Sequence, residues 1–312
     1  MSYRLQFDEP LERNLSRIAI EQLDRASAEL QGQAGDRAEA VHQLRKRCKK
    51  IRGLLRLFRD SLDETYSQEN AWFRDLARRF SGARDAEAML ECLDKLCNSF
   101  EEDLESDAFA TVRDALAKRK SELKEDADLP DRIAAAIAEL QDARGRVLGW
   151  RLDNDGFAAV EGGLLRTYRR ARKAMRAAFA EPSPERFHEW RKRVKYHWYH
   201  LRLLRDIWPA PMKALAAETK QLADLLGDDH DLAVLQDTLQ AEEPGDRDEI
   251  ATLLSLAQKR QEQLKAAAQT QGWRLFNGKP KELRGRLHAC WQARECERFQ
   301  QTGLGVEDKA VC

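Results

Sequence analysis

The stretch Val41–Asp60, VHQLRKRCKKIRGLLRLFRD, recurs further along the chain as Phe187–Asp206, FHEWRKRVKYHWYHLRLLRD. The offset is 146 residues, and ten of the twenty aligned positions are identical. The same offset aligns Leu76–Leu90 with Leu222–Gln236 without a gap, and these segments share a Leu, an Ala and an Asp. Two separate matches at one offset predict an internal duplication of a unit of about 146 residues.

The duplication predicts one domain over residues 5–300, made of two halves. The halves are expected at about 5–152 and about 158–300, with a tail at 301–312. Their junction is expected in Asp153–Gly163, because this segment is rich in Asp, Asn and Gly, which are typical of loops.

Both copies of the repeat have the spacing of an amphipathic helix. With 100° per residue, the basic residues of the first copy form one stripe about 100° wide. This stripe contains His42, Arg45, Lys46, Lys49 and Arg56. The opposite side carries Leu44, Cys48, Ile51, Leu55 and Phe58. In the second copy, the stripe of His188, Arg191, Lys192, Lys195 and Arg202 is backed by Trp190, Val194 and Leu201.

A third basic stripe is predicted in Gly163–Arg176, where Arg166, Arg169, Arg170 and Lys173 follow helical spacing. Tyr168 and Met175 are expected on its apolar side. The corresponding part of the first half, around Leu15–Ser27, has no such stripe, which indicates that the two halves have diverged there.

The composition of the whole chain favours long helices. Of the 312 residues, 35% are charged and 42% are hydrophobic, with 16 Gly and 8 Pro, and the mean hydropathy is −0.69. Helical periodicity is interrupted at short segments, which we expect to be loops: residues 32–36, around Ser67, 126–130, 153–163, 181–184, 209–211, 242–246 and 272–280. The sequence therefore predicts an all-α fold.

The sequence predicts neither a membrane-spanning segment nor a metal site. No apolar run of about 18 residues occurs, so no membrane span is predicted, and without a secretory signal we expect a cytoplasmic protein. The six cysteines lack zinc-finger spacing, so no metal site is expected.

Overall neutrality, with 54 basic and 54 acidic residues, conceals a segregation of charge. The segments 41–60, 163–176 and 187–206 together carry 20 basic and 3 acidic residues. The rest of the chain carries 34 basic and 51 acidic residues, a net charge of −17. Like charges at i,i+3 and i,i+4 repel, so such stripes favour a binding site for an external polyanion. The alternative is a solvated face, or a face neutralised by acidic helices of the same fold.

The two His-x-x-Arg-Lys motifs, at His42 and His188, resemble the hallmark of the CHAD family, the conserved histidine α-helical domain. The segments Leu225–Leu235, Gly163–Arg176 and Lys279–Trp291 are also similar to that family. The resemblance implies two four-helix-bundle-like halves related by pseudo-twofold symmetry. It also implies a central basic channel that binds inorganic polyphosphate without catalysis and without a cofactor.

Carried onto this sequence, the resemblance and the stripes together give a candidate polyphosphate site. The expected binding residues are His42, Arg45, Lys46, Lys49, Arg52, Arg56, Arg166, Arg169, Arg170, Lys173, His188, Arg191, Lys192, Lys195, Tyr199 and Arg202. Asp85 and Asp231, which align in the repeat, either orient basic side chains of their own halves or cap helices that begin after the expected loop residues Gly82 and 227–229.

The histidines lie among cations that disfavour their protonation, whereas bound phosphate favours it. We therefore expect polyphosphate to bind more tightly near pH 6 than near pH 8.

Two other functions remain open from the sequence. A phosphohydrolase needs carboxylates that hold a metal beside the phosphate, and the basic segments carry almost none. A nucleic-acid-binding protein could stack bases on Tyr196, Trp198 and Tyr199, although we favour packing of these aromatics inside the protein, because the first copy has no such aromatic set. Association with polyphosphate granules is compatible with the binding function.

Overall fold

The computed structural model describes residues 3–32, 37–80, 82–103, 109–124, 128–242, 244 and 246–302. In this part of the chain the secondary structure is helical, with no strand, which confirms the all-α prediction. The α-helices are α1 (Leu11–Gly32), α2 (Arg37–Leu57), α3 (Asp63–Arg78), α4 (Gly82–Asn98), α5 (Ala110–Lys124), α6 (Leu129–Val147), α7 (Ala158–Ala180), α8 (Pro184–Leu203), α9 (Pro209–Glu242), α10 (Arg247–Phe276) and α11 (Pro280–Thr302). Two short 3₁₀ helices, η1 (Glu101–Asp103) and η2 (Arg205–Ile207), complete the order.

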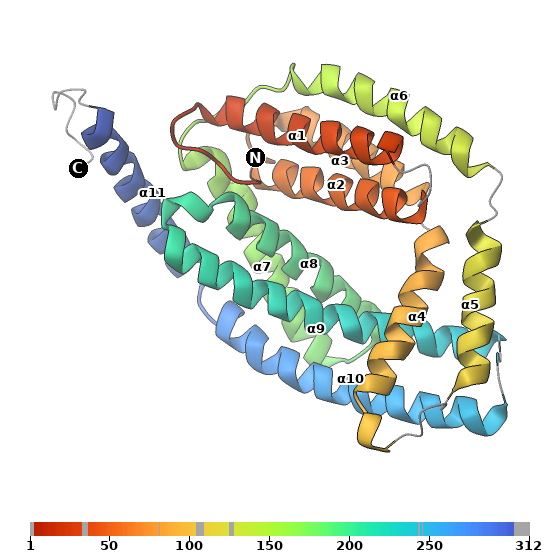
Figure 1. Ribbon diagram of the computed structural model, residues 1–312. Coiled ribbons are helices and arrows are strands. Elements are labelled where there is room, and N and C mark those ends of the chain that lie inside the picture. The colour runs from red at the N-terminus through yellow and green to blue at the C-terminus, as the bar shows by residue number, and fades with distance from the viewer. Residues whose placement is uncertain are drawn as a thin grey trace.

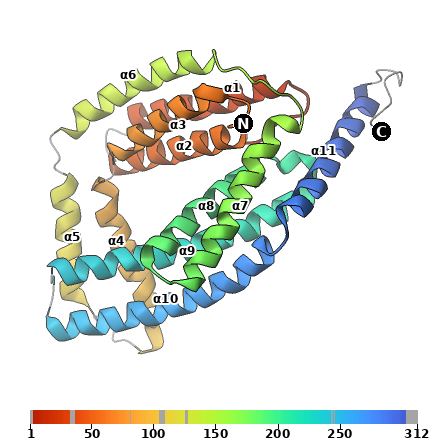
Figure 2. The same ribbon diagram turned by 180° about the vertical axis from the view of Figure 1, so that it is seen from behind.

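The helices form two groups that meet along α2 and α8 (Figures 1 and 2). In one group, α1 packs on α2 and α6, and α2 packs on α3. In the other, α7, α8, α9 and α10 pack in sequence. The hairpin of α4 and α5 leaves the first group and packs against the far ends of α9 and α10 (Figure 1). None of the described helices is both long and apolar enough to cross a lipid bilayer.

Two apolar clusters hold this arrangement together. The larger one joins both helix groups and includes Trp190, Phe58 and Phe187, whose side chains are almost completely buried. The smaller one lies where the α4–α5 hairpin meets α9 and α10, and it contains Leu93, Val112 and Leu253. The long helices α9 and α10 extend from the first cluster to the second, and so connect the two.

The predicted apolar faces of α2 and α8 are buried. Leu44, Cys48, Ile51, Leu55 and Phe58 are each at most 1% exposed, as are Trp190, Val194 and Leu201. Because this face repeats with helical period, burying it leaves the basic stripe of each helix outside the core. The apolar positions therefore determine where the cations point.

A glycine sets how closely α2 and α8 approach. A Cβ at Gly53 would lie 3.0 Å from the side chain of Tyr199, so any larger residue would push the helices apart. The ring nitrogen Nε2 of buried His200 lies 3.1 Å from the carbonyl oxygen of Gly53, and this contact fixes the crossing. A second glycine, Gly163, allows α7 to cross the end of α2, where a Cβ would meet the backbone of Leu57 at 2.2 Å.

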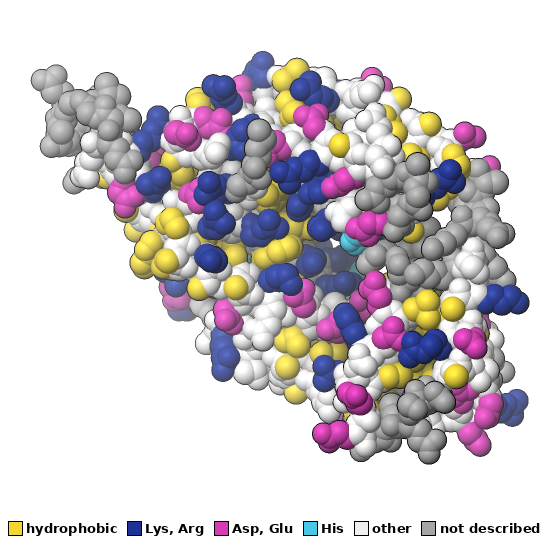
Figure 3. Space-filling view, viewed as in Figure 1, with side chains coloured by type: hydrophobic (Ala, Val, Ile, Leu, Met, Phe, Trp, Pro, Cys, Tyr) yellow, Lys and Arg dark blue, Asp and Glu magenta, His cyan; other side chains and the backbone are white. Residues whose placement is uncertain are grey.

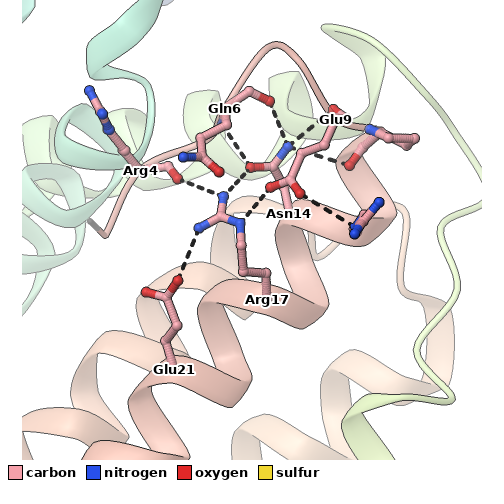
Figure 4. Close-up of polar contacts among 8 residues, drawn as sticks. Arg4, Gln6, Glu9, Asn14, Arg17 and Glu21 are labelled. Carbon is pink, nitrogen blue, oxygen red and sulfur yellow. Dashed lines mark hydrogen bonds and ion pairs between the residues drawn. The ribbon is translucent and has the colours of Figure 1, made fainter. Parts of the chain in front are cut away.

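The segment before α1 ties the two groups together (Figure 4). The buried Asn14 amide binds Gln6 in both directions at 2.7 Å, and Arg17 donates to the carbonyl oxygen of Arg4 at 3.3 Å. On the other side, the Leu5 amide donates to the carbonyl oxygen of Leu203 at 2.8 Å. The segment is thus bonded to α1 on one side and to the end of α8 on the other.

Several predicted helix boundaries are confirmed. Ser183 caps α8 by accepting a hydrogen bond from the Arg186 amide at 3.3 Å, with Pro184 at the first helical position. Several predicted loops are wrong, since residues 209–211 form the first turn of α9 and residues 272–276 are the end of α10. Ser67 lies inside α3, where its hydroxyl bonds the carbonyl of Glu64 at 2.9 Å, and Gly227 lies inside α9. Gly227 serves close packing, because a Cβ there would lie 3.3 Å from the guanidinium of Arg191.

Candidate functional site

The basic stripes of α2 and α8 line one groove of about 460 Å³, which we call the basic groove. One wall is formed by α2 and the other by α8, and α3 closes one side. The polar and charged residues that line it are Arg45, Lys49, Arg52, Arg56, Arg74, Arg78, His188, Glu189, Arg191, Lys192, Arg193, Lys195, Tyr196 and Tyr199. Ten of them are Lys or Arg, so cations from segments about 146 residues apart in the sequence converge on one concave surface.

Few carboxylates neutralise this surface. Glu189 is the acidic side chain among the described lining residues, and it pairs with Lys192 at 2.7 Å and with Arg193. In the part of the chain that the structure describes, Lys49, Arg52 and Lys195 form no ion pair with a carboxylate. At these three cations, the described structure shows no neutralisation by acidic side chains of the same fold, which was the alternative to a polyanion site.

The crowding of cations lowers the proton affinity of the lysines. Lys49 is exposed, yet loss of solvent contact in the groove and the charges of Arg45, Arg191 and Lys195 lower its pKa from 10.5 to about 8. Burial lowers the pKa of Lys195 as well, with Arg191 as the largest charged contributor. A bound anion would offset the positive potential at both amines.

The two motif histidines have different environments. His188 lines the groove and packs on His230 of α9, with 4.0 Å between the ring centroids. Burial is the largest cause that lowers the pKa of His188 to about 4, and His230, Lys192 and Arg191 lower it further. This agrees in direction with the sequence prediction, with burial as an additional cause. His42 and Lys46 lie on α2 but are not among the residues that line the groove.

The predicted stripe on α7 lies beside the groove and does not line it. Arg166, Arg169, Arg170 and Lys173 are all exposed, while Tyr168 and Met175 are buried as predicted. The charge of Arg193 is the largest cause that lowers the pKa of Arg170, and Arg56 contributes to it. Arg170 of α7 therefore lies close enough to Arg56 and Arg193 of the groove to add to its positive field.

The aligned aspartates Asp85 and Asp231 were expected either to orient basic side chains or to cap helices. Asp231 lies in the middle of α9, so it caps no helix, and one of its oxygens is 3.8 Å from the guanidinium of Arg191. Asp231 therefore pairs with a basic side chain of its own half, but the separation is too long for a strong hydrogen bond that would orient it. Asp85 falls within α4, but its side chain lies outside the described part of the chain.

The aromatic residues of α8 are mostly engaged within the protein. Tyr199 lines the groove but is only 4% exposed and packs on Gly53, so its main role is in packing. Arg56 lies over the ring of Tyr196 at 4.3 Å, and Arg202 lies over Trp198 at 4.9 Å. Ring faces that are covered by cations of the same chain leave little room for stacked bases.

A second basic cavity of about 350 Å³ lies on the other side of the α2–α8 contact, between α1, α2, α8 and α9. Lys50 lines this cavity, whereas its neighbour Lys49 lines the basic groove. The cavity is lined by seven cations and no described carboxylate: Arg4, Arg25, Lys50, Arg202, Arg205, Lys213 and Lys220. Figure 3 shows Lys and Arg side chains gathered around a hollow in the middle of one face, over the seam between the two helix groups.

Most of these additional cations could not be found from the sequence. Arg74 and Arg78 come from α3, which has mixed charge, and Arg25 comes from the helix that lacks a stripe. Lys50 lies within the first copy of the repeat, but it is not on the basic stripe. The sequence therefore did not indicate that it lines a cavity. Predicted Arg202 belongs to this second cavity and not to the basic groove.

A third concavity, the mixed-charge cavity of about 330 Å³, lies between α4, α9 and α10. It is lined by both signs of charge: Glu91, Lys95, Asp228, Asp231 and Arg260. Lys95 donates to Asp228 at 2.9 Å, and this bond raises the pKa of Lys95. Lys95 and Asp228 of this cavity are thus paired with each other inside the protein.

Two comparisons with known proteins bear on this geometry. The family model described as CHAD domain matches residues 17–240, which is more than half of the chain. This match covers α2, α3, α7 and α8, and so includes the basic groove. No curated protein matched the chain.

Proposed function

The chain belongs to the CHAD domain family, which is associated with polyphosphate binding, and from that premise we propose that it binds inorganic polyphosphate in the basic groove. The observation that carries the proposal is the convergence of α2 and α8 cations on one groove, in which Lys49 and Lys195 form no ion pair with a carboxylate of the described residues. A linear polyanion supplies the missing negative charges along the whole groove. Arginine binds phosphate oxygens with a planar fork, and lysine binds them as a point charge.

The dimensions of the site favour an extended ligand. From Arg45 to Arg56, the α2 residues that line the groove span about 16 Å at 1.5 Å per residue. The positive field continues on α7 at one end of the groove, and the second basic cavity lies across the α2–α8 contact. We therefore propose that the two cavities form one channel between two bundle halves related by a pseudo-twofold axis, as the sequence repeat suggests.

Binding without hydrolysis is part of the proposal. Glu189, the acidic residue among the described groove residues, is occupied by Lys192 and Arg193. A phosphohydrolase would need free carboxylates or histidines that hold a metal near the ligand. Incubation with Mg²⁺ and long-chain polyphosphate should release no phosphate, and turnover that is lost when Glu189 is replaced by Gln would contradict this proposal.

The binding proposal is tested by titrating labelled polyphosphate into the protein. We expect a specific complex whose affinity falls steeply with salt, by analogy with the counterion release that accompanies binding to nucleic acids. Polyphosphate that fails to bind at low salt would contradict the proposed function.

Nucleic acid is the main competing ligand, because basic helices also bind its phosphates. Single-stranded RNA of equal charge should compete weakly, since the rings of Tyr196 and Trp198 are covered by cations of the protein itself. If RNA displaced polyphosphate at equal phosphate concentration and physiological salt, nucleic-acid binding would be the better assignment. Attachment to polyphosphate granules in the cytoplasm follows from the proposed function and is part of the same proposal.

A further inference from the structure

One amine in the basic groove combines three properties that are seldom found together. Lys49 is exposed to the groove, has no ion-pair partner among the described residues, and is surrounded by other cationic side chains. The charged groups that act on it are Arg45 and Arg52 of the same helix, and Arg191 and Lys195 of α8. Arg74 and Arg78 of α3 line the same groove.

We propose that Lys49 is a site of acylation by acyl phosphates, which dock their phosphate group on the surrounding cations and transfer the acyl group to the lysine. In this reaction the unprotonated Nζ attacks the carbonyl carbon, and a C–N bond forms while the bond from that carbon to the phosphate oxygen breaks. The electron pair of that bond leaves with the phosphate, which takes up the proton lost from nitrogen. The products are an amide and hydrogen phosphate, and no further reactant is required.

The groove would favour this reaction in two ways, by keeping the amine unprotonated and by binding the phosphate group of the reagent. Neighbouring cations and partial desolvation keep a large fraction of Lys49 unprotonated near neutral pH, which is a recognised way to activate a lysine nucleophile. Docking of the phosphate places the acyl carbon next to the amine, so that a bimolecular step becomes effectively intramolecular. Lys195 lines the same groove and also has a lowered pKa, but its side chain is less exposed than that of Lys49.

Two other lysines serve as internal standards. Lys50 has its pKa lowered to about 8 as well, but its side chain is 8% exposed, so reagents reach it poorly. Lys95 is exposed and lines a cavity, but Asp228 holds it in the charged form. If the acylation rate depended on the pKa alone, Lys49 and Lys50 would react at equal rates. If it depended on exposure alone, Lys49 and Lys95 would react at equal rates.

Acylation would remove a positive charge from the centre of the groove. This consequence rests on the proposed function: an acylated chain would hold polyphosphate less tightly, and bound polyphosphate would shield Lys49 from acylation. The modification itself does not depend on polyphosphate, so the two proposals can fail separately.

The test treats the full chain with acetyl phosphate near pH 8 and maps acetylated lysines by mass spectrometry over time. We expect Lys49 to react about tenfold faster than Lys95, because far more of it is unprotonated. Lys50 should lie between the two. Equal rates at Lys49 and Lys95 would overturn the proposal.

A second reagent isolates the contribution of phosphate docking. Acetic anhydride transfers the same acyl group but carries no phosphate, so it senses only the reactivity and exposure of each amine. The ratio of Lys49 to Lys95 acetylation should be several-fold higher with acetyl phosphate than with acetic anhydride, and inorganic sulfate should reduce it. An identical ratio with both reagents would show that the groove does not dock acyl phosphates and would overturn the proposal even if polyphosphate binds.

Discussion

Lys49 and Lys95 both line concave surfaces of the same molecule, yet the protein shifts their pKa values in opposite directions. In the basic groove, burial and neighbouring cations lower the pKa of Lys49 to about 8. In the mixed-charge cavity, the hydrogen bond to Asp228 raises the pKa of Lys95. The amine of Lys95 thus already has a carboxylate partner, whereas that of Lys49 has none among the described residues.

The comparison also explains why two regions of similar volume have different proposed roles. Paired charges stabilise local packing and offer little to a ligand, because each would have to be separated from its partner. Cations without partners repel one another, and a bound polyanion recovers that energy. The predictions below test this difference, beginning with the largest effect.

Neutralising both walls of the groove should cause the largest loss of binding. The variant R45Q/K49Q/R191Q/K195Q removes two cations from α2 and two from α8. At about 1 kcal/mol for each lost charged contact, the affinity for polyphosphate should fall about a thousandfold. Fluorescence polarisation with labelled polyphosphate measures the loss.

The matched control removes cations from the mixed-charge cavity. K95Q/R260Q should change the affinity less than about twofold, because those charges lie away from the groove and are screened by salt. Circular dichroism should show unchanged helicity for both variants. A similar loss in the two variants would mean that only the net charge matters, and the groove would lose its assigned role.

The pH dependence of binding should follow the groove lysine. The free pKa of Lys49 is about 8, and a bound anion raises it, so the contribution to binding is complete below pH 7 and is lost as the pH rises through 8. The affinity should fall about tenfold between pH 7 and pH 9. K49R, which keeps its charge over this range, should show a much smaller decrease, and an equal decrease in both proteins would contradict the assignment.

The sequence analysis assigned tighter binding near pH 6 than near pH 8 to the histidines, but the structure favours the lysines as its cause. His188, with a pKa of about 4, is neutral at both pH 6 and pH 8 in the free protein. We still expect tighter binding near pH 6 than near pH 8, but with the lysines as the main cause. H188Q should therefore retain most of this pH dependence, as measured by the same titration.

The smallest expected effect concerns Asp231, which lies between the basic groove and the mixed-charge cavity. A separation of 3.8 Å from Arg191 is too long for a strong hydrogen bond, so its charge should matter more than any orienting role. D231N should tighten binding about twofold at low salt, and the gain should vanish at high salt. Weaker binding would instead support an orienting role.

Much of the fold could be predicted because burial follows helical period. The apolar residues of α2 and α8 recur every three to four positions. This spacing predicted both helices and the side of each helix that carries the basic stripe. Gly227 was misread because a glycine inside a helix looks like a break in sequence, whereas here it makes room for Arg191. Close packing of this kind depends on a partner 36 residues away and leaves no local signal.

The site was predictable only where cations form stripes. Arg45, Lys49, Arg191 and Lys195 have the expected spacing and meet in the groove. Arg74 reaches the same groove from a helix of mixed charge, and the packing of α3 on α2 is what brings it there. The adjacent lysines 49 and 50 enter different cavities, because neighbouring helical residues point about 100° apart.

The most direct test of the central claim is the pKa of the Lys49 amine, measured by NMR on protein with labelled lysine side chains, with and without polyphosphate. K49R identifies the resonance. In the free protein the pKa should be about 8, and saturating polyphosphate should raise it toward or above 10.5. A pKa near 10.5 in the free protein, or one that polyphosphate leaves unchanged, would contradict the claim that α2 and α8 hold uncompensated cations for a polyanion.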